Sequence, residues 1–235
     1  LLGESTIELP MPLGGVESED ARAARSMALT LGCSLSTVEI PRTLDRLVAD
    51  VQVVTKFLGH GQKTHVQCCH PVLHLVRRLR EDGHECAVIG TGGVVEDARA
   101  CAVILGRDGE AAARAHRRER LLGTGPSATN SMIALARSLG VEMVQPYAES
   151  RLAEYGLSLD MAIINYPFQK GIAVRAFPEF WGLRPWRRRR DPLQVGSGIR
   201  AWHDELLSSA ALNRRGSRLV VGVYNEKARE VGRGL

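Results

Sequence analysis

A short apolar run that ends in a cluster of glycines constrains this chain most. Residues 86–89 read Cys-Ala-Val-Ile, and Gly90, Thr91, Gly92 and Gly93 follow directly. A continuous apolar run of this kind is typical of a strand buried on both faces, as in a parallel sheet. Glycines after such a strand let the backbone approach a ligand and present amide groups to an anion. We therefore expect residues 90–93 to bind phosphate groups; a tight turn that binds nothing is the alternative.

The segments before this run alternate between strand-like and helix-like patterns. Strands are predicted at residues 5–9 and 34–40, since each is short, rich in β-branched residues and followed by proline. Helices are predicted at residues 18–32 and 43–54, with Ser18 as an N-cap and Gly32 as a stop. A third helix is predicted to end near Gly83, and Pro71 either opens it or lies early in it. This alternation over residues 5–105 predicts an α/β fold with a doubly wound, mostly parallel sheet.

From about residue 95 the pattern becomes helical. Apolar residues recur at helical spacing in four segments: 96–105, 110–122, 127–139 and 149–159. We therefore divide the chain into an α/β portion at residues 1–105 and a mainly helical carboxyl-terminal portion of the same domain at residues 106–235.

Composition bears on the cellular compartment of this chain and on the partners that it can bind. No apolar run reaches the roughly 20 residues that a membrane helix needs, so no membrane attachment is expected. The 5 cysteines are odd in number and lie in apolar segments, which indicates reduced thiols in the cytoplasm. A net charge of +5 is too small to argue for a nucleic-acid partner.

Two acidic residues follow the glycine cluster. Glu96 and Asp97 are candidates for holding Mg²⁺ against a polyphosphate, because carboxylate oxygens are the ligands that this ion prefers. The alternative is an exposed first helical turn, where acids are favoured by the helix dipole alone, and taken in isolation the pair favours this simpler interpretation.

A cluster of side chains that can bind metals lies between residues 65 and 74. Its members are His65, Cys68, Cys69, His70 and His74. His70 and His74 share one face if the helix has begun by that point. However, no paired Cys-x-x-Cys is present and the neighbours are apolar, so the pattern favours a packed helix over a zinc site.

A basic and aromatic stretch precedes a second glycine-containing turn. Residues 187–190 are all arginine and lie close in sequence to Trp181 and Trp186. Such side chains could contact phosphates or stack on bases. A solvated loop is the alternative, because a four-residue basic run is weak evidence for nucleic acid. The sequence Gln-x-Gly-Ser-Gly at residues 194–198 favours phosphate contacts within a nucleotide site.

Several stretches, taken in order, resemble one known family: the synthetase domain of asparagine synthetases and β-lactam synthetases. Residues 7–10 and 19–24 resemble the family's second strand and the helix after it. Residues 86–93 resemble the strand and glycine loop of its pyrophosphate site. Later segments are similar to its closing motifs, at residues 135–147, 154–159, 170–175 and 187–198. The likeness covers nearly the whole chain and implies a Rossmann-like fold of the adenine nucleotide alpha-hydrolase type.

This resemblance implies an AMP-forming ligase like glutamine-hydrolysing asparagine synthase. In that reaction ATP activates an aspartate-like carboxylate as an acyl-adenylate, and ammonia or an amine then displaces AMP. The implied cofactors are ATP and Mg²⁺, and nearby cations offset the charge that builds on the pyrophosphate. The implied roles are adenine contact for Ile7 and Leu9, phosphate contact for Gly90, Thr91, Gly92, Gly93, Gly196 and Ser197, and catalysis by Lys170 and Arg190.

The chain departs from the family in ways that bear on activity. The family's S-G-G-x-D-S loop would lie upstream of residue 5, and its amino-terminal glutaminase domain is also missing. Val94 and Val95 stand where acids are expected. Arg190 stands where the family has a reactive lysine, and arginine does not readily release a proton.

These departures leave several hypotheses open. One is a carboxyl-terminal fragment that works with an upstream domain or a separate glutaminase chain, and another is a domain that has lost full activity. A non-catalytic nucleotide-binding or assembly module is an alternative from a different class. A nucleobase- or nucleic-acid-modifying relative on the same fold is a further one, although nucleic acid is not the favoured partner. A homodimer is also left open.

Overall fold

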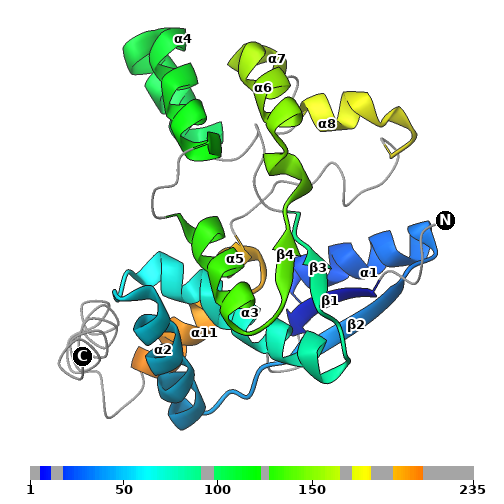
Figure 1. The fold of residues 1–235 in the computed structure, drawn as a ribbon, viewed down its shortest axis with the longest axis vertical. Helices are drawn as coiled ribbons and strands as arrows, with labels where there is room; N and C mark the ends of the chain where they lie inside the picture. The colour runs from blue at the N-terminus through cyan, green and yellow to red at the C-terminus, as the bar shows by residue number, and fades with distance from the viewer. Residues whose placement is uncertain are drawn as a thin grey trace. The chain divides into compact units, whose positions relative to one another are not determined.

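The computed structural model describes residues 6–11, 18–90, 98–122, 127–164, 171–180 and 193–208. These residues group into two compact units (Figure 1). The first unit holds β1 (Thr6–Met11), α1 (Glu19–Leu31), β2 (Ser34–Glu39), α2 (Leu44–Leu58), α3 (Lys63–Glu81), most of α5 (Ala128–Ser138), α10 (Leu193–Gly196) and α11 (Ile199–Ser208). The second unit holds β3 (Cys86–Val88), α4 (Ala98–Leu122), β4 (Glu142–Val144), α6 (Ser150–Ser158), α7 (Met161–Ile164), α8 (Gly171–Ala176) and the 3-10 turns η1 (Pro146–Ala148) and η2 (Pro178–Phe180).

The first unit begins with a β-α-β arrangement. β1 and β2 pair in parallel with Thr6 opposite Ser34 and Met11 opposite Glu39, and α1 connects them. Helices α1 and α3 both pack against this two-stranded sheet (Figure 1). In a parallel pair joined by a helix, the amino-terminal turn of that helix follows the carboxyl end of the first strand.

Local sequence signals explain where the first helices begin and end. The Ser18 side chain caps α1 by accepting a hydrogen bond from the backbone N–H of Ala21, at 3.1 Å. Thr43 caps α2 in the same way through the N–H of Arg46, at 3.3 Å. Gly32 and Gly59 end these helices at φ 67°, a left-handed conformation that glycine adopts without strain. The predicted starts of both helices and the predicted stop of α1 at Gly32 are confirmed, whereas α2 continues to Leu58, beyond its predicted end at residue 54.

Helices α2 and α3 form the core of the first unit. Their facing side chains are completely buried: Leu47, Val51 and Val54 from α2, and Val66, Cys69, Leu73 and Val76 from α3. α11 packs against both helices, and α10 packs against α3. Ile199 and Trp202 of α11 close this side of the core together with Ile40.

The prediction that Pro71 opens a helix or lies early in it misjudges where α3 begins. α3 runs from Lys63 to Glu81 and contains Pro71 in its interior. Proline cannot donate the usual hydrogen bond to the preceding turn, which is why the sequence favoured a helix start there. Tertiary packing overrides this preference, because residues 65–74 are all buried. His70 and His74 therefore lie one turn apart on a continuous helix.

The second unit is held by a small apolar cluster and a buried arginine. Cys101 and Ala113 of α4 pack with Met161 of α7. Arg117 is also buried and donates hydrogen bonds to the carbonyl oxygens of Gly156 and Leu159, at the end of α6. α4 is interrupted at Gly109, whose φ is 86°. This break agrees with the two helices predicted on either side of it.

The predicted doubly wound sheet is wrong. Within the described ranges, the strands form two separate parallel pairs, β1 with β2 and β3 with β4. One reason is that α3 follows α2 with no strand between them, so the expected alternation breaks down. Another is that β3 has 3 residues and alternates in burial, with Val88 72% exposed. A short apolar run cannot distinguish a fully buried strand from a half-exposed one, and here it does not mark an interior strand.

Candidate functional site

Two of the predicted nucleotide-binding residues lie on β1. Ile7 is paired with Leu35 and Leu9 with Thr37, so both belong to the parallel pair that α1 connects. The carboxyl ends of parallel strands are where open α/β sheets bind ligands. The predicted placement of a strand at this point in the chain is confirmed, and the role of these two residues stays a prediction.

Gly196 lies against the first turn of α1. A Cβ atom built on Gly196 would lie 2.3 Å from Oδ2 of Asp20 and 2.7 Å from both Oδ1 and Cγ. Real Cβ atoms do not approach a carboxylate so closely, so any larger residue at position 196 would require the Asp20 side chain to turn away. Asp20 lies in the first turn of α1, so the structure brings Gly196 to the helix that connects β1 to β2.

The residues on either side of Gly196 are also fixed. Gln194 accepts a hydrogen bond from the Cys68 thiol of α3, with Sγ and Oε1 3.4 Å apart. Ser197 is buried, and its hydroxyl donates to the carbonyl oxygen of Leu193. The Ser197 hydroxyl therefore serves its own helical turn, and its predicted phosphate contact would have to come from the backbone.

Of the remaining residues predicted to bind nucleotide or Mg²⁺, the structure describes only Gly90. Gly90 follows β3 and is exposed, and a Cβ atom built on it would meet nothing within 4 Å. Packing therefore does not require glycine at position 90. Seven predicted residues lie outside the described ranges: Thr91, Gly92, Gly93, Glu96, Asp97, Lys170 and Arg190.

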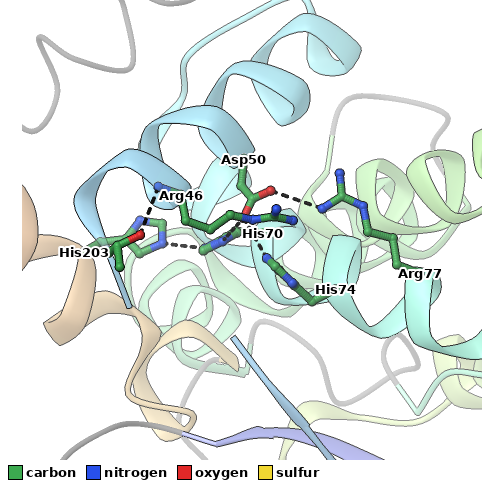
Figure 2. A network of polar contacts seen from close by, with 7 residues as sticks. Arg46, Asp50, His70, His74, Arg77 and His203 are labelled. Carbon is green, nitrogen blue, oxygen red and sulfur yellow. Dashed lines mark hydrogen bonds and ion pairs between the residues drawn. The ribbon is translucent and has the colours of Figure 1, made fainter. Parts of the chain in front are cut away.

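A network of polar side chains in the first unit surrounds Asp50, as Figure 2 shows. Its carboxylate is 2% exposed. Oδ2 accepts hydrogen bonds from His74 Nε2 at 2.7 Å and from Arg46 Nε at 3.0 Å, and Oδ1 accepts one from Arg77 Nη1 at 3.1 Å. Four side chains from the facing surfaces of α2 and α3 thus meet in one network.

His70 extends this network to α11. Its Nδ1 lies 2.8 Å from Nε2 of His203, and both rings are completely buried. Its Nε2 lies 3.4 Å from Asp50 Oδ2 but makes no hydrogen bond of acceptable geometry with any described atom. His70 therefore stands between a carboxylate on α2 and an imidazole on α11.

Burial and charge set the protonation states in this network. Burial by itself raises the pKa of Asp50, but the close approach of His70 and the hydrogen bond and charge of His74 outweigh it and hold the pKa well below its ordinary value. Burial lowers the pKa of His70, with only partial compensation by Asp50. Burial lowers the pKa of His203 strongly, and the charges of His70 and Lys63 lower it further. At neutral pH the site thus holds an ionised carboxylate and two neutral imidazoles.

Ion pairs attach α11 to this part of the fold. Lys63 Nζ lies 2.8 Å from Oδ1 of Asp204, and Arg42 Nη2 lies 3.2 Å from Oε2 of Glu205. The Arg42 guanidinium also lies 5.8 Å from the centre of the Trp202 ring. These contacts flank His203 in sequence and fix the helix that carries it.

The structure divides the predicted His/Cys cluster. It brings His70 and His74 to Asp50 but leaves the cysteines outside the network. Burial raises the pKa of Cys68 to about 11, and burial together with the neighbouring Cys68 raises that of Cys69 to about 12. Both thiols are therefore protonated at neutral pH, a form that binds metals poorly.

Sequence reasoning missed Asp50 and His203. Asp50 could have been found, because it shares the apolar face of α2 with Leu47, Val51 and Val54, and an acid on such a face requires a partner. No local signal identifies His203, which is 133 residues away from His70 in the sequence.

Comparisons with known proteins do not identify this chain. No protein-family model matches it, and no curated protein matches it. Among the described helices, none is long and apolar enough to cross a membrane.

Proposed function

We propose that this chain is the nucleotide-binding part of an asparagine-synthetase-like enzyme that forms amide bonds at the expense of ATP. ATP would activate an aspartate-like carboxylate as an acyl-adenylate with release of pyrophosphate. Ammonia or an amine would then displace AMP. Lys170 and Arg190 would supply the cations beside the reacting centre, and Glu96 and Asp97 the carboxylates for Mg²⁺.

One observation carries this proposal: the contact between Gly196 and Asp20. It joins the Gln-x-Gly-Ser-Gly segment to the helical turn after β1, although the two are 176 residues apart in the sequence. These are two of the segments on which the resemblance to the synthetase family depends. We expect the first turn of α1 to lie near the carboxyl end of β1, the place where open α/β sheets bind nucleotides. The proposal rests on the first unit, because β3 is not the interior strand that the resemblance implies.

The test is aspartate-dependent exchange of labelled pyrophosphate into ATP by the complete natural polypeptide in the presence of Mg²⁺. Exchange that is lost in Lys170→Ala is the expected result, because exchange reports adenylate formation directly. No exchange with aspartate or other small carboxylates would reject the enzyme. Calorimetry with ATP then separates a non-catalytic nucleotide-binding module, which binds without exchange, from a chain that binds no nucleotide.

A glycine substitution tests the site itself. Gly196→Ala places a methyl group where the Asp20 carboxylate lies and makes that side chain turn away, so ATP affinity should fall if the nucleotide lies beside this contact. Gly106→Ala is the matched control, because a Cβ atom at position 106 meets nothing within 4 Å. Equal ATP affinity in both variants would place the nucleotide elsewhere.

A further inference from the structure

We propose that Asp50, His70 and His74 form a binding site for a divalent transition-metal ion, with zinc as the ion that fits the donors best. The proposal is independent of the ATP chemistry, because none of these residues belongs to the predicted nucleotide site.

The three donor atoms already converge. Asp50 Oδ2, His70 Nε2 and His74 Nε2 lie within 4.8 Å of one another, and all three side chains are buried. The carboxylate oxygen is 3.4 Å from His70 Nε2 and 2.7 Å from His74 Nε2. Donors at zinc–ligand lengths of about 2.1 Å around a tetrahedral ion are roughly 3.4 Å apart. Binding thus requires His74 to move outward by a fraction of an ångström.

His70 provides an independent indication of a ligand. Its Nε2 is buried, faces Asp50 and makes no hydrogen bond of acceptable geometry among the described residues. Its other nitrogen is held by His203 at 2.8 Å. Metal-binding histidines need such an outer partner, because a hydrogen bond from the second ring nitrogen fixes the tautomer that leaves the first nitrogen free to coordinate. His203 would accept that hydrogen bond.

A metal ion can bind Asp50 only if the guanidinium groups of Arg46 and Arg77 move away, and both side chains are exposed enough to do so. The Arg46 and Arg77 side chains are 42% and 36% exposed, whereas Asp50 is 2% exposed. Their guanidinium groups can turn toward solvent while Asp50 stays in place. His74 Nε2 now shares a hydrogen bond with the carboxylate, and its lone pair must be free of a proton when it binds the ion.

The donor set selects the class of ion. Two imidazole nitrogens and one carboxylate oxygen suit zinc and its neighbours in the first transition row, and they do not suit Mg²⁺, which takes oxygen ligands. Among the described residues, the donor atoms that converge here are those of Asp50, His70 and His74, and no cysteine is among them. Since the ligands come from α2 and α3, a bound ion would join the two helices that form the core of the first unit.

The test uses the wild-type chain first. The chain is freed of metal with a chelator, dialysed, and titrated with Zn²⁺ by calorimetry and with Co²⁺ by visible absorption. We expect one ion per chain and no thiolate-to-cobalt charge-transfer band. X-ray absorption of the zinc-loaded chain should show two imidazoles. Any of three results would overturn the proposal: no stoichiometric metal binding, a thiolate-to-cobalt band, or a metal coordination sphere that contains no imidazole.

Variants then assign the ligands. His74→Gln should lose zinc binding, and His203→Gln should weaken it by about 10- to 100-fold, as expected for an outer partner of a ligand. His84→Gln is the matched control, because His84 is exposed. Wild-type affinity in a folded His74→Gln chain would refute the site. If that variant does not fold, the X-ray absorption spectrum of the wild-type chain decides.

Discussion

His70 Nδ1 and His203 Nε2 lie 2.8 Å apart, and both rings are completely buried. Burial and the neighbouring positive charges lower the pKa of both groups, so at neutral pH the pair shares one hydrogen bond between neutral rings. This contact joins α3 to α11, and it is the part of the polar network to which α11 contributes a side chain.

Replacing His203 should destabilise the first unit. His203→Ala leaves His70 Nδ1 without its partner and opens a cavity beside Trp202, for a combined cost of about 2–4 kcal/mol. The measurement is urea unfolding followed by circular dichroism. His84→Ala, at an exposed position, should leave the midpoint unchanged. Equal midpoints for the two variants would show that the buried contact contributes nothing.

Stability should fall as the pH is lowered from about 6.5, the ordinary histidine pKa. His70 and His203 have lowered pKa values in the folded chain, so the unfolded chain takes up protons first. Each such proton reduces the free energy of unfolding by about 1.4 kcal/mol per pH unit. Below about 3.8 the lowered pKa of Asp50 adds a loss of the same sign. Urea unfolding between pH 7.5 and 5.5 measures the slope, which should be shallower in His203→Ala; a flat wild-type profile would contradict the assignment.

Arg117 should be required for the second unit. It is 1% exposed and satisfies the carbonyl oxygens of Gly156 and Leu159. Arg117→Met keeps the apolar stem but leaves those acceptors unpaired, which costs about 1–3 kcal/mol each. Hydrogen exchange should increase in residues 150–164. Arg118→Met, at an exposed neighbouring position, is the control and should exchange as the wild type does.

The cysteines should react in two classes. Cys86 is exposed, whereas Cys68, Cys69 and Cys101 are buried, and the first two of these have raised pKa values of about 11 and 12. Because the thiolate is the reactive form, iodoacetamide at pH 8 should modify Cys86 first. Mass spectrometry of the folded chain should find Cys68 and Cys69 unmodified until denaturant is added. Rapid modification of either one would show that α3 is open in solution.

Much of the local structure could be predicted. The cap at Ser18, the helix start at Thr43, the stop at Gly32 and the break near Gly109 all depend on interactions within about one helical turn. The strand at residues 34–39 was predicted to within a residue of its end. The start of α3 was missed because burial outweighs the local preference of Pro71.

The architecture could not be predicted in the same way. The apolar run at residues 86–89 indicated an interior strand, yet β3 pairs only with β4 among the described strands and exposes Val88. Strand pairing depends on which segments meet in space, and hydrophobic pattern alone does not decide that for a run of four residues.

The sequence by itself determined the ends of the first helices and supplied the side chains of the candidate sites, because capping and backbone conformation are settled by near neighbours. Only the tertiary structure decided that Asp50, His74 and His70 meet, and that His203 and Gly196 come back to α3 and α1 from the far end of the described chain. Those contacts follow from the packing of whole apolar faces, and no spacing within a single segment contains that information.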